Sequence, residues 1–132
     1  MKNIPDNEEL ARFILFRSHY SVKKRRIKFS AFMPPRNKRE VSVFCISGLD
    51  EKPIWDIGYS EVHNPEKGRT LRARGDLYAQ DARDLDLDVV PETSTHERHA
   101  NIEGFPKDEV ERKNFAIELA RVAKLVVVPD DY

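Results

Sequence analysis

The chain has 132 residues, of which 39% are hydrophobic and 35% are charged. This length suits one domain spanning residues 1–132, and seven Phe, four Tyr and one Trp supply enough apolar bulk to exclude a disordered chain. A lone cysteine excludes an internal disulfide, and the longest apolar run, residues 125–128, is too short to cross a bilayer. With no apolar signal segment at the N-terminus, we expect a cytoplasmic protein without membrane contact.

Positive charge is concentrated in the first third of the chain. Residues 1–39 carry eleven Lys or Arg against three acidic residues, a net charge of +8, while the whole chain is neutral. We interpret this as a basic surface for an anionic partner, either nucleic acid or an acidic protein. The alternative is a solvated loop that faces the acidic residues between 76 and 92. The candidate binding residues are Lys23, Lys24, Arg25, Arg26, Lys28, Arg36, Lys38 and Arg39.

The first half of the chain predicts a helix, two strands and a second helix. Residues 6–19 place Leu10, Phe13 and Ile14 on one helical face behind an Asp-x-x-Glu capping box. Residues 26–33 and 40–47 alternate in hydrophobicity, and we expect them to pair as an antiparallel hairpin. The second of these has apolar residues on both faces, which indicates a central strand. A short helix is expected over 52–62, with Asp50 as its cap.

The second half predicts one long helix and several short extended segments. Residues 70–81 fit a strand, although 76–88 fit a short helix equally well, and 87–90 are extended. The clearest helix covers 106–124, with Phe115, Leu119 and Val122 as its buried stripe. Residues 125–128 form a final strand or a packed tail. The fold class is therefore α+β, with a small antiparallel sheet of two to four strands flanked by N- and C-terminal helices.

Polar side chains of several kinds crowd into residues 95–106, just before the long helix. Arg98, His99 and Asn101 together suit a phosphorylated or nucleotide ligand, because arginine binds phosphate bidentately and histidine titrates near neutral pH. Glu61 or Glu103 would supply the carboxylate partner of such a catalytic site. The alternative is structural, with His99 and Asn101 hydrogen-bonded to nearby backbone. No phosphate loop or nucleophile motif is present to decide between them.

Metal binding is not favoured by the spacing of the soft ligands. Cys45, His63, His96 and His99 are the candidates, but no paired Cys-x-x-Cys signature occurs. Cys45 lies between apolar neighbours, where a small buried side chain is the usual explanation. We therefore expect no metal and no cofactor. Trp55 is expected to anchor the core rather than to present a stacking surface.

Three segments together resemble a group of small uncharacterised bacterial proteins of about this length. They are Ala-Phe-Met-Pro-Pro at 31–35 followed by Ser-Val-Phe at 42–44, the Gly-Leu of 48–49 leading to Ile-Trp-Asp-Ile-Gly at 54–58, and Arg-His-Ala-Asn-Ile-Glu-Gly-Phe-Pro at 98–106. The resemblance implies no activity, but it suggests that any distinctive chemistry involves Arg98, His99 and Asn101. The sequence thus favours an accessory or binding protein that uses its basic N-terminal surface. The alternative is a small enzyme at the Arg/His/Asn site.

Overall fold

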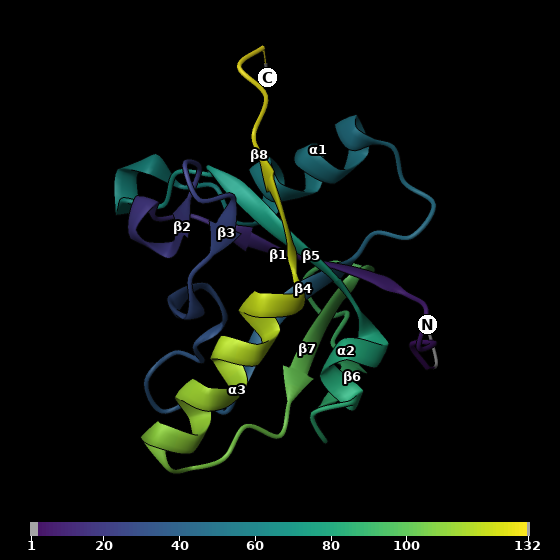
Figure 1. Ribbon diagram of the computed structural model, residues 1–132. Helices are drawn as coiled ribbons and strands as arrows, with labels where there is room; N and C mark the ends of the chain where they lie inside the picture. Colours follow the sequence, from purple (N-terminus) through teal and green to yellow (C-terminus); the bar gives the residue numbers. More distant parts are fainter. Residues whose placement is uncertain (1–2, 132) are drawn as a thin grey trace.

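The computed structural model describes residues 3–131 as an α+β fold built on a six-stranded sheet (Figure 1). The strand order is β6-β7-β4-β1-β5-β8, and each neighbouring pair is antiparallel. The predicted α+β class is confirmed, but the sheet has six strands, more than the two to four that were predicted. The strands are β1 (Glu9–Ile14), β4 (Glu40–Cys45), β5 (Ala73–Tyr78), β6 (Asp88–Pro91), β7 (His99–Glu103) and β8 (Lys124–Val127).

The prediction of an N-terminal helix is wrong, because residues 9–14 form the strand β1. This strand lies inside the sheet, where it pairs with β5 over its full length and with β4 at Leu10 and Ala11. Both of its faces are apolar: Leu10 and Ile14 enter one core cluster, and Ala11 and Phe13 enter the other. Burial on two sides produces apolar residues at spacings that a one-sided helix also shows.

The predicted hairpin between residues 26–33 and 40–47 does not form. Only Arg26–Ile27 is a strand, β3, and it pairs with β2 (Tyr20–Ser21) in a separate two-stranded ribbon. The chain then turns through the 3₁₀ helix Phe29–Phe32, which buries Phe32 completely and so accounts for an aromatic residue that did not fit a strand. β4 is a central strand as predicted, but its partners are β1 and β7.

The later elements follow the sequence more closely. α1 (Glu51–Glu61) begins after Asp50, and of the two alternatives for residues 125–128 the structure has the final strand, β8. Residues 70–90 contain both alternatives in succession, since β5 is followed by the short helix α2 (Ala79–Arg83) and then by β6. α3 (Glu109–Val122) begins after Asp108, whose side chain accepts a hydrogen bond from Glu111 N at 3.0 Å.

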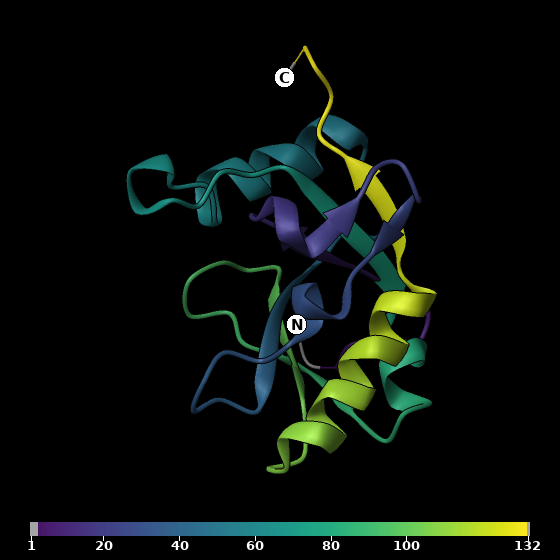
Figure 2. The ribbon, with the colours of Figure 1, turned by 60° about the vertical axis from the view of Figure 1, so that its left-hand side comes forward.

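The helices divide unequally between the two faces of the sheet (Figures 1 and 2). α2, α3 and the 3₁₀ helix at 29–32 cover the face that contains Val41 and Val43 of β4. α1 covers the other face through Ile54, Trp55 and Ile57. On β7 that second face carries His99, Asn101 and Glu103, which belong to neither core cluster. Polar side chains on the sheet are therefore available for a site beside β4 and β7.

Candidate functional site

Four of the predicted binding residues form the exposed tip of the β2–β3 ribbon. Lys23, Lys24, Arg25 and Arg26 are all exposed, and Arg25 turns the chain with φ 51°. Lys28 comes directly after β3, at the base of the ribbon, and is exposed as well. The ribbon lies beside α3 and β8 (Figure 2). The sequence thus places five cations on one small protruding element.

The other basic residues of the predicted surface lie in the loop 34–39, apart from the ribbon tip in both ribbon views (Figures 1 and 2). Arg36, Lys38 and Arg39 are exposed there. The guanidinium Nε of Arg39 donates to the carbonyl of Phe105 at 2.7 Å, which ties this loop to the start of the α3 segment. The predicted basic surface therefore consists of two separate groups of cations.

The acidic residues between 76 and 92 do not pair with the basic ribbon. Asp76 binds Arg74, and Asp88 lies 3.5 Å from Arg83. No ion pair within residues 3–131 involves Lys23, Lys24, Arg25 or Arg26. The positive charge of the ribbon is left to solvent or to a partner.

His99, at the start of β7, is 9% exposed and is held by the loop before it. Its Nδ1 lies 2.7 Å from the carbonyl oxygen of Glu92 and 3.2 Å from that residue's Oε2. The short contact with a carbonyl indicates that Nδ1 carries a proton and donates it. The imidazole also meets the ring of Phe44 edge-on, with the centroids 5.2 Å apart. His99 is therefore fixed by backbone and aromatic contacts.

The remaining candidates of the Arg/His/Asn site lie in different places. Arg98 directs Nη1 to the carbonyl of Cys45 at 3.3 Å. Glu61, at the end of α1, lines a different cavity with His63 and Arg69. Glu103 lies beside Glu40 at the far end of β7, where burial chiefly raises the pKa of its carboxyl. Only His99 and Asn101 of the predicted cluster share a cavity.

That cavity, with a volume of about 300 Å³, opens on the β7 side of β4. Ser42 stands opposite Asn101 in the register of the two strands. The loop 34–39 supplies Lys38, and β1 supplies Arg12, which the sequence analysis did not single out. Its signal was a charged residue between the apolar pairs Leu10-Ala11 and Phe13-Ile14 of that strand. The lining residues are Arg12, Pro35, Lys38, Glu40, Ser42, Glu92, His99 and Asn101.

The soft metal ligands considered in the sequence are engaged separately. His96 Nδ1 accepts from Arg98 N at 3.0 Å, and His63 Nδ1 accepts from Leu71 N at 2.9 Å. Cys45 is buried in the core next to β7. Throughout the described chain, no group of three or more His, Cys, Asp or Glu side chains has the arrangement that holds a metal ion.

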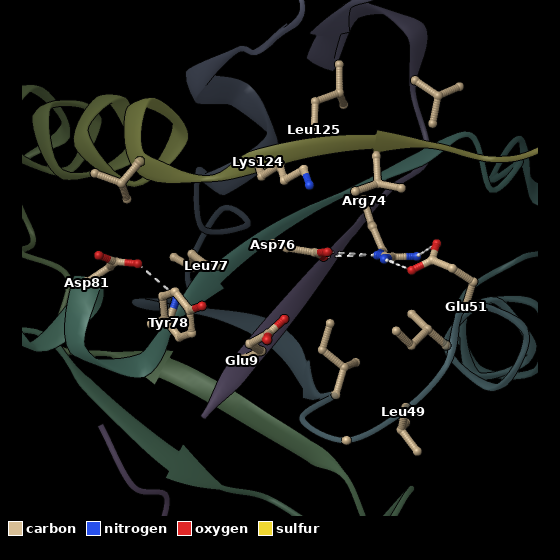
Figure 3. Close-up of a pocket in the computed structure, with 16 residues that line it drawn as sticks. Glu9, Leu49, Glu51, Arg74, Asp76, Leu77, Tyr78, Asp81, Lys124 and Leu125 are labelled. Carbon is tan, nitrogen blue, oxygen red and sulfur yellow. Dashed lines mark hydrogen bonds and ion pairs between the residues drawn. The ribbon is translucent and has the colours of Figure 1, made fainter. Parts of the chain in front are cut away.

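The largest cavity lies elsewhere, where β5 and β8 meet the start of α1 (Figure 3). It measures about 800 Å³, and Arg74 lies in its wall with 2% of its surface exposed. Arg74 Nε donates to both carboxylate oxygens of Asp76 at 3.0 and 3.1 Å. Its Nη1 and Nη2 donate to the two oxygens of Glu51 at 3.0 and 2.8 Å. One guanidinium thus joins β5 to α1 through Glu51, and Asp76 of its own strand holds it in place.

Charged groups in the wall of this cavity pair with one another and form a structural network. The hydrogen bond with Arg74 lowers the pKa of Glu51, whereas burial raises the pKa of Asp76 in spite of the same partner. Trp55 is 1% exposed beneath the guanidinium, which confirms it as a core anchor. Since Arg74 is occupied by protein carboxylates, it offers no free cation to a ligand. The cavity's other charged side chains are Glu9, Asp81 and Lys124 (Figure 3).

Neither the helices of the described residues nor comparison with known proteins adds evidence about function to this geometry. Within residues 3–131, every helix is too short or too polar to cross a membrane. Comparison with protein-family models, with curated proteins and with solved structures finds no match for this chain.

Proposed function

We propose that the chain is a binding protein whose β2–β3 ribbon contacts nucleic acid. The observation that supports this most is the run Lys23-Lys24-Arg25-Arg26, exposed at the ribbon tip with no carboxylate partner in the described structure. The chain has no acidic residue between Glu9 and Glu40. A cation that is already solvated and unpaired loses little when it meets a phosphate, and the counterions released from the nucleic acid drive the association.

Aromatic groups at the base of the ribbon favour a single strand over a duplex. Phe16 is 44% exposed, and its ring meets His19 edge-on at 5.1 Å. The carbonyl of His19 accepts from Lys28 N at 2.9 Å, so this aromatic pair adjoins the cations of the ribbon. Unstacked bases bind aromatic rings, and cations beside the rings hold the backbone of the strand. Bases in a duplex are stacked on each other and do not offer that surface.

The geometry gives less support to the small enzyme. A catalytic site was expected to gather Arg98, His99 and a carboxylate around one open cavity. Arg98 instead donates to Cys45, and Nδ1 of His99 is held by the backbone of Glu92. Such hydrogen bonds are what a structural role for the histidine requires.

The test is a titration of the protein against a single-stranded and a duplex oligonucleotide at two salt concentrations. The variant replaces Lys23, Lys24 and Arg26 by alanine and keeps Arg25, whose positive φ makes it a special backbone position. A matched control replaces three exposed cations elsewhere, Lys67, Arg69 and Lys107, by alanine. Both variants lose the same net charge, so only the place of the charge differs.

We expect the ribbon variant to bind more weakly and with a flatter salt dependence than the control. Each phosphate contact with a single strand contributes about −0.7 to the log–log slope, so loss of three contacts changes the slope by about 2. Circular dichroism confirms that both variants are folded. Absence of binding at low salt, or equal loss in the two variants, would contradict the proposal. Binding to an acidic polypeptide but not to nucleic acid would assign the ribbon to a protein partner instead.

A further inference from the structure

Arg12 is a partly buried cation that the protein does not neutralise. It lies on β1, where its Nε donates to the carbonyl of Ala31 at 2.8 Å and its Nη1 donates to the carbonyl of Ser42 at 3.0 Å. None of the ion pairs found in residues 3–131 includes it. Loss of water around the guanidinium lowers the pKa of Arg12 to about 10.

An unpaired, partly desolvated guanidinium is costly, and an anion would remove most of that cost. Two backbone carbonyls fix the plane of the Arg12 side chain but use only two of its five N–H groups. The remaining donors, Nη2 among them, are available to a bound ligand. A planar fork of donors held in one orientation suits phosphate, whose oxygens accept two parallel hydrogen bonds.

The cavity beside Arg12 contains a second polar side chain, which has no hydrogen-bond partner among the described residues. Asn101 is 9% exposed, and its side-chain amide makes no hydrogen bond with the described residues. Trp55 and Arg72 carry the fully buried unpaired side-chain atoms of residues 3–131, so the Asn101 amide is accessible from the cavity, where it can bond to a ligand. Lys38 adds a cation from the loop 34–39, and Ser42 adds a hydroxyl. Glu40 and Glu92 also line the cavity and provide acceptors for hydroxyl or amino groups.

A smaller cavity, of about 80 Å³, shares Arg12 and Ser42 with the first and has an aromatic wall. Phe16, His19 and Phe44 line it. Burial, followed by the charge of Arg12, lowers the pKa of His19, so its ring is neutral at neutral pH and suited to contact a base. Arg12 thus separates a polar cavity from an aromatic one.

We propose that these two adjoining cavities bind one nucleotide. The phosphate lies against Arg12, Lys38 and Asn101, and the base lies against Phe16 and Phe44. Glu40 and Glu92 accept hydrogen bonds from the ribose hydroxyls. The nucleotide is either a free nucleoside monophosphate or a terminal unit of a single strand. Only the second source rests on the nucleic-acid function proposed above, because Phe16 also adjoins the basic ribbon.

The direct test is a titration of the full chain with adenosine 5′-monophosphate, with adenosine and inorganic phosphate as separate arms. The nucleotide should bind more tightly than either fragment, since inorganic phosphate lacks the base contacts and adenosine lacks the phosphate contacts. Amide and side-chain NMR shifts of the wild-type protein should report the binding at Arg12, Phe16 and Asn101. A single-stranded oligonucleotide with and without a 5′-phosphate distinguishes the two sources: a preference for the phosphorylated end indicates the strand.

Substitution of Asn101 decides whether the binding occurs in this cavity. Asn101→Asp keeps the shape but puts a negative charge beside the phosphate, and we expect it to weaken nucleotide binding at least about tenfold. Asn64→Asp makes the same chemical change in the loop after α1, outside both cavities, and should leave the affinity unchanged. Arg12→Lys keeps the charge but removes the fork of donors, so it should also weaken binding.

The outcomes separate this site from the ribbon. Replacing Lys23, Lys24 and Arg26 by alanine should weaken oligonucleotide binding and leave adenosine 5′-monophosphate binding intact. The nucleotide site is overturned if the wild type binds the nucleotide with a dissociation constant above about 1 mM. It is also overturned if the residues whose NMR signals shift on binding lie away from both cavities. It is also overturned if Asn101→Asp and Asn64→Asp, both folded by circular dichroism, have equal effects. Binding of the free nucleotide without any oligonucleotide binding would sustain this site and remove the ribbon proposal.

Discussion

The guanidinium carbon of Arg74 lies 4.7 Å from the centre of the Trp55 ring. This contact stacks a β5 side chain on the main aromatic residue of α1, while Glu51 from α1 and Asp76 from β5 hold the guanidinium at its edges. A cation over an indole face gains further stability when water is excluded, and Arg74 is almost completely buried. The network therefore fixes the position of α1 on the sheet.

Removal of the cation should destabilise the fold more than removal of the whole buried pair. In Arg74→Met, Asp76 keeps a mostly buried charge without a partner, and we expect a loss of about 3 kcal/mol in the free energy of unfolding. The double variant Arg74→Met with Asp76→Leu removes that charge and should recover part of the loss. Urea unfolding followed by Trp55 fluorescence measures both. Equal stabilities for the two variants would show that the Asp76 charge is not the source of the cost.

Asp76→Asn should change how stability depends on pH. Burial raises the pKa of Asp76 above its ordinary value of 3.8, so the folded wild type binds a proton more readily than the unfolded chain. The Asp76 carboxyl therefore contributes most stability below pH 3.8 and loses that contribution as pH rises through the folded pKa. The stability of the variant relative to wild type should therefore increase with pH. The difference in free energy of unfolding, variant minus wild type, should be larger at pH 7 than at acid pH. Urea unfolding at several pH values checks this, and an opposite trend would mean that Arg74 outweighs burial.

Much of the fold could be predicted from local pattern, and the two failures have different physical causes. The helix α1, the strand β4 and the long helix α3 each have one clear period or cap. β1 does not, because a strand covered on both faces carries apolar residues at Leu10, Ala11, Phe13 and Ile14, and a helical spacing can be found among them. The segment after β3 alternates like a strand, but Phe32 is buried only because the chain turns there.

The candidate sites were predicted less completely than the fold, because they depend on register. His99 and Asn101 could be named from their chemistry, and β7 places both on one face of the sheet. Arg12 could not be placed near them, since residues 89 positions apart in sequence meet only after β1, β4 and β7 have paired. Arg98 adjoins His99 in sequence, yet its side chain is directed to Cys45.

The buried stripe of α3 should show a graded response to alanine. The sequence predicts Phe115, Leu119 and Val122 on this stripe, but Leu119 is 0% exposed, Phe115 is half-buried and Val122 is 41% exposed. Leu119→Ala should cost about 2–5 kcal/mol, because it empties a fully packed position. Phe115→Ala should lower the free energy of unfolding by less than the same change at a fully buried phenylalanine would. Val122→Ala should lower it by less than about 1 kcal/mol. Denaturant unfolding of the three variants provides the ranking, and a cost at Val122 as large as at Leu119 would place the helix face differently.

Cys45 should be inert towards alkylation while the protein is folded. Burial is the main cause that raises the pKa of its thiol to about 11, and the charge of Glu8 adds to the shift while Arg98 opposes it. At pH 8 about a thousandth of such a thiol is ionised, compared with about a quarter of an ordinary exposed one. Iodoacetamide should therefore react slowly with the native chain and rapidly after unfolding in urea. Arg98→Ala removes the one cation that lowers this pKa, so the folded variant should react no faster than wild type. Mass spectrometry measures the rate of alkylation. Rapid alkylation of the native chain would show that the core opens to solvent at the end of β4.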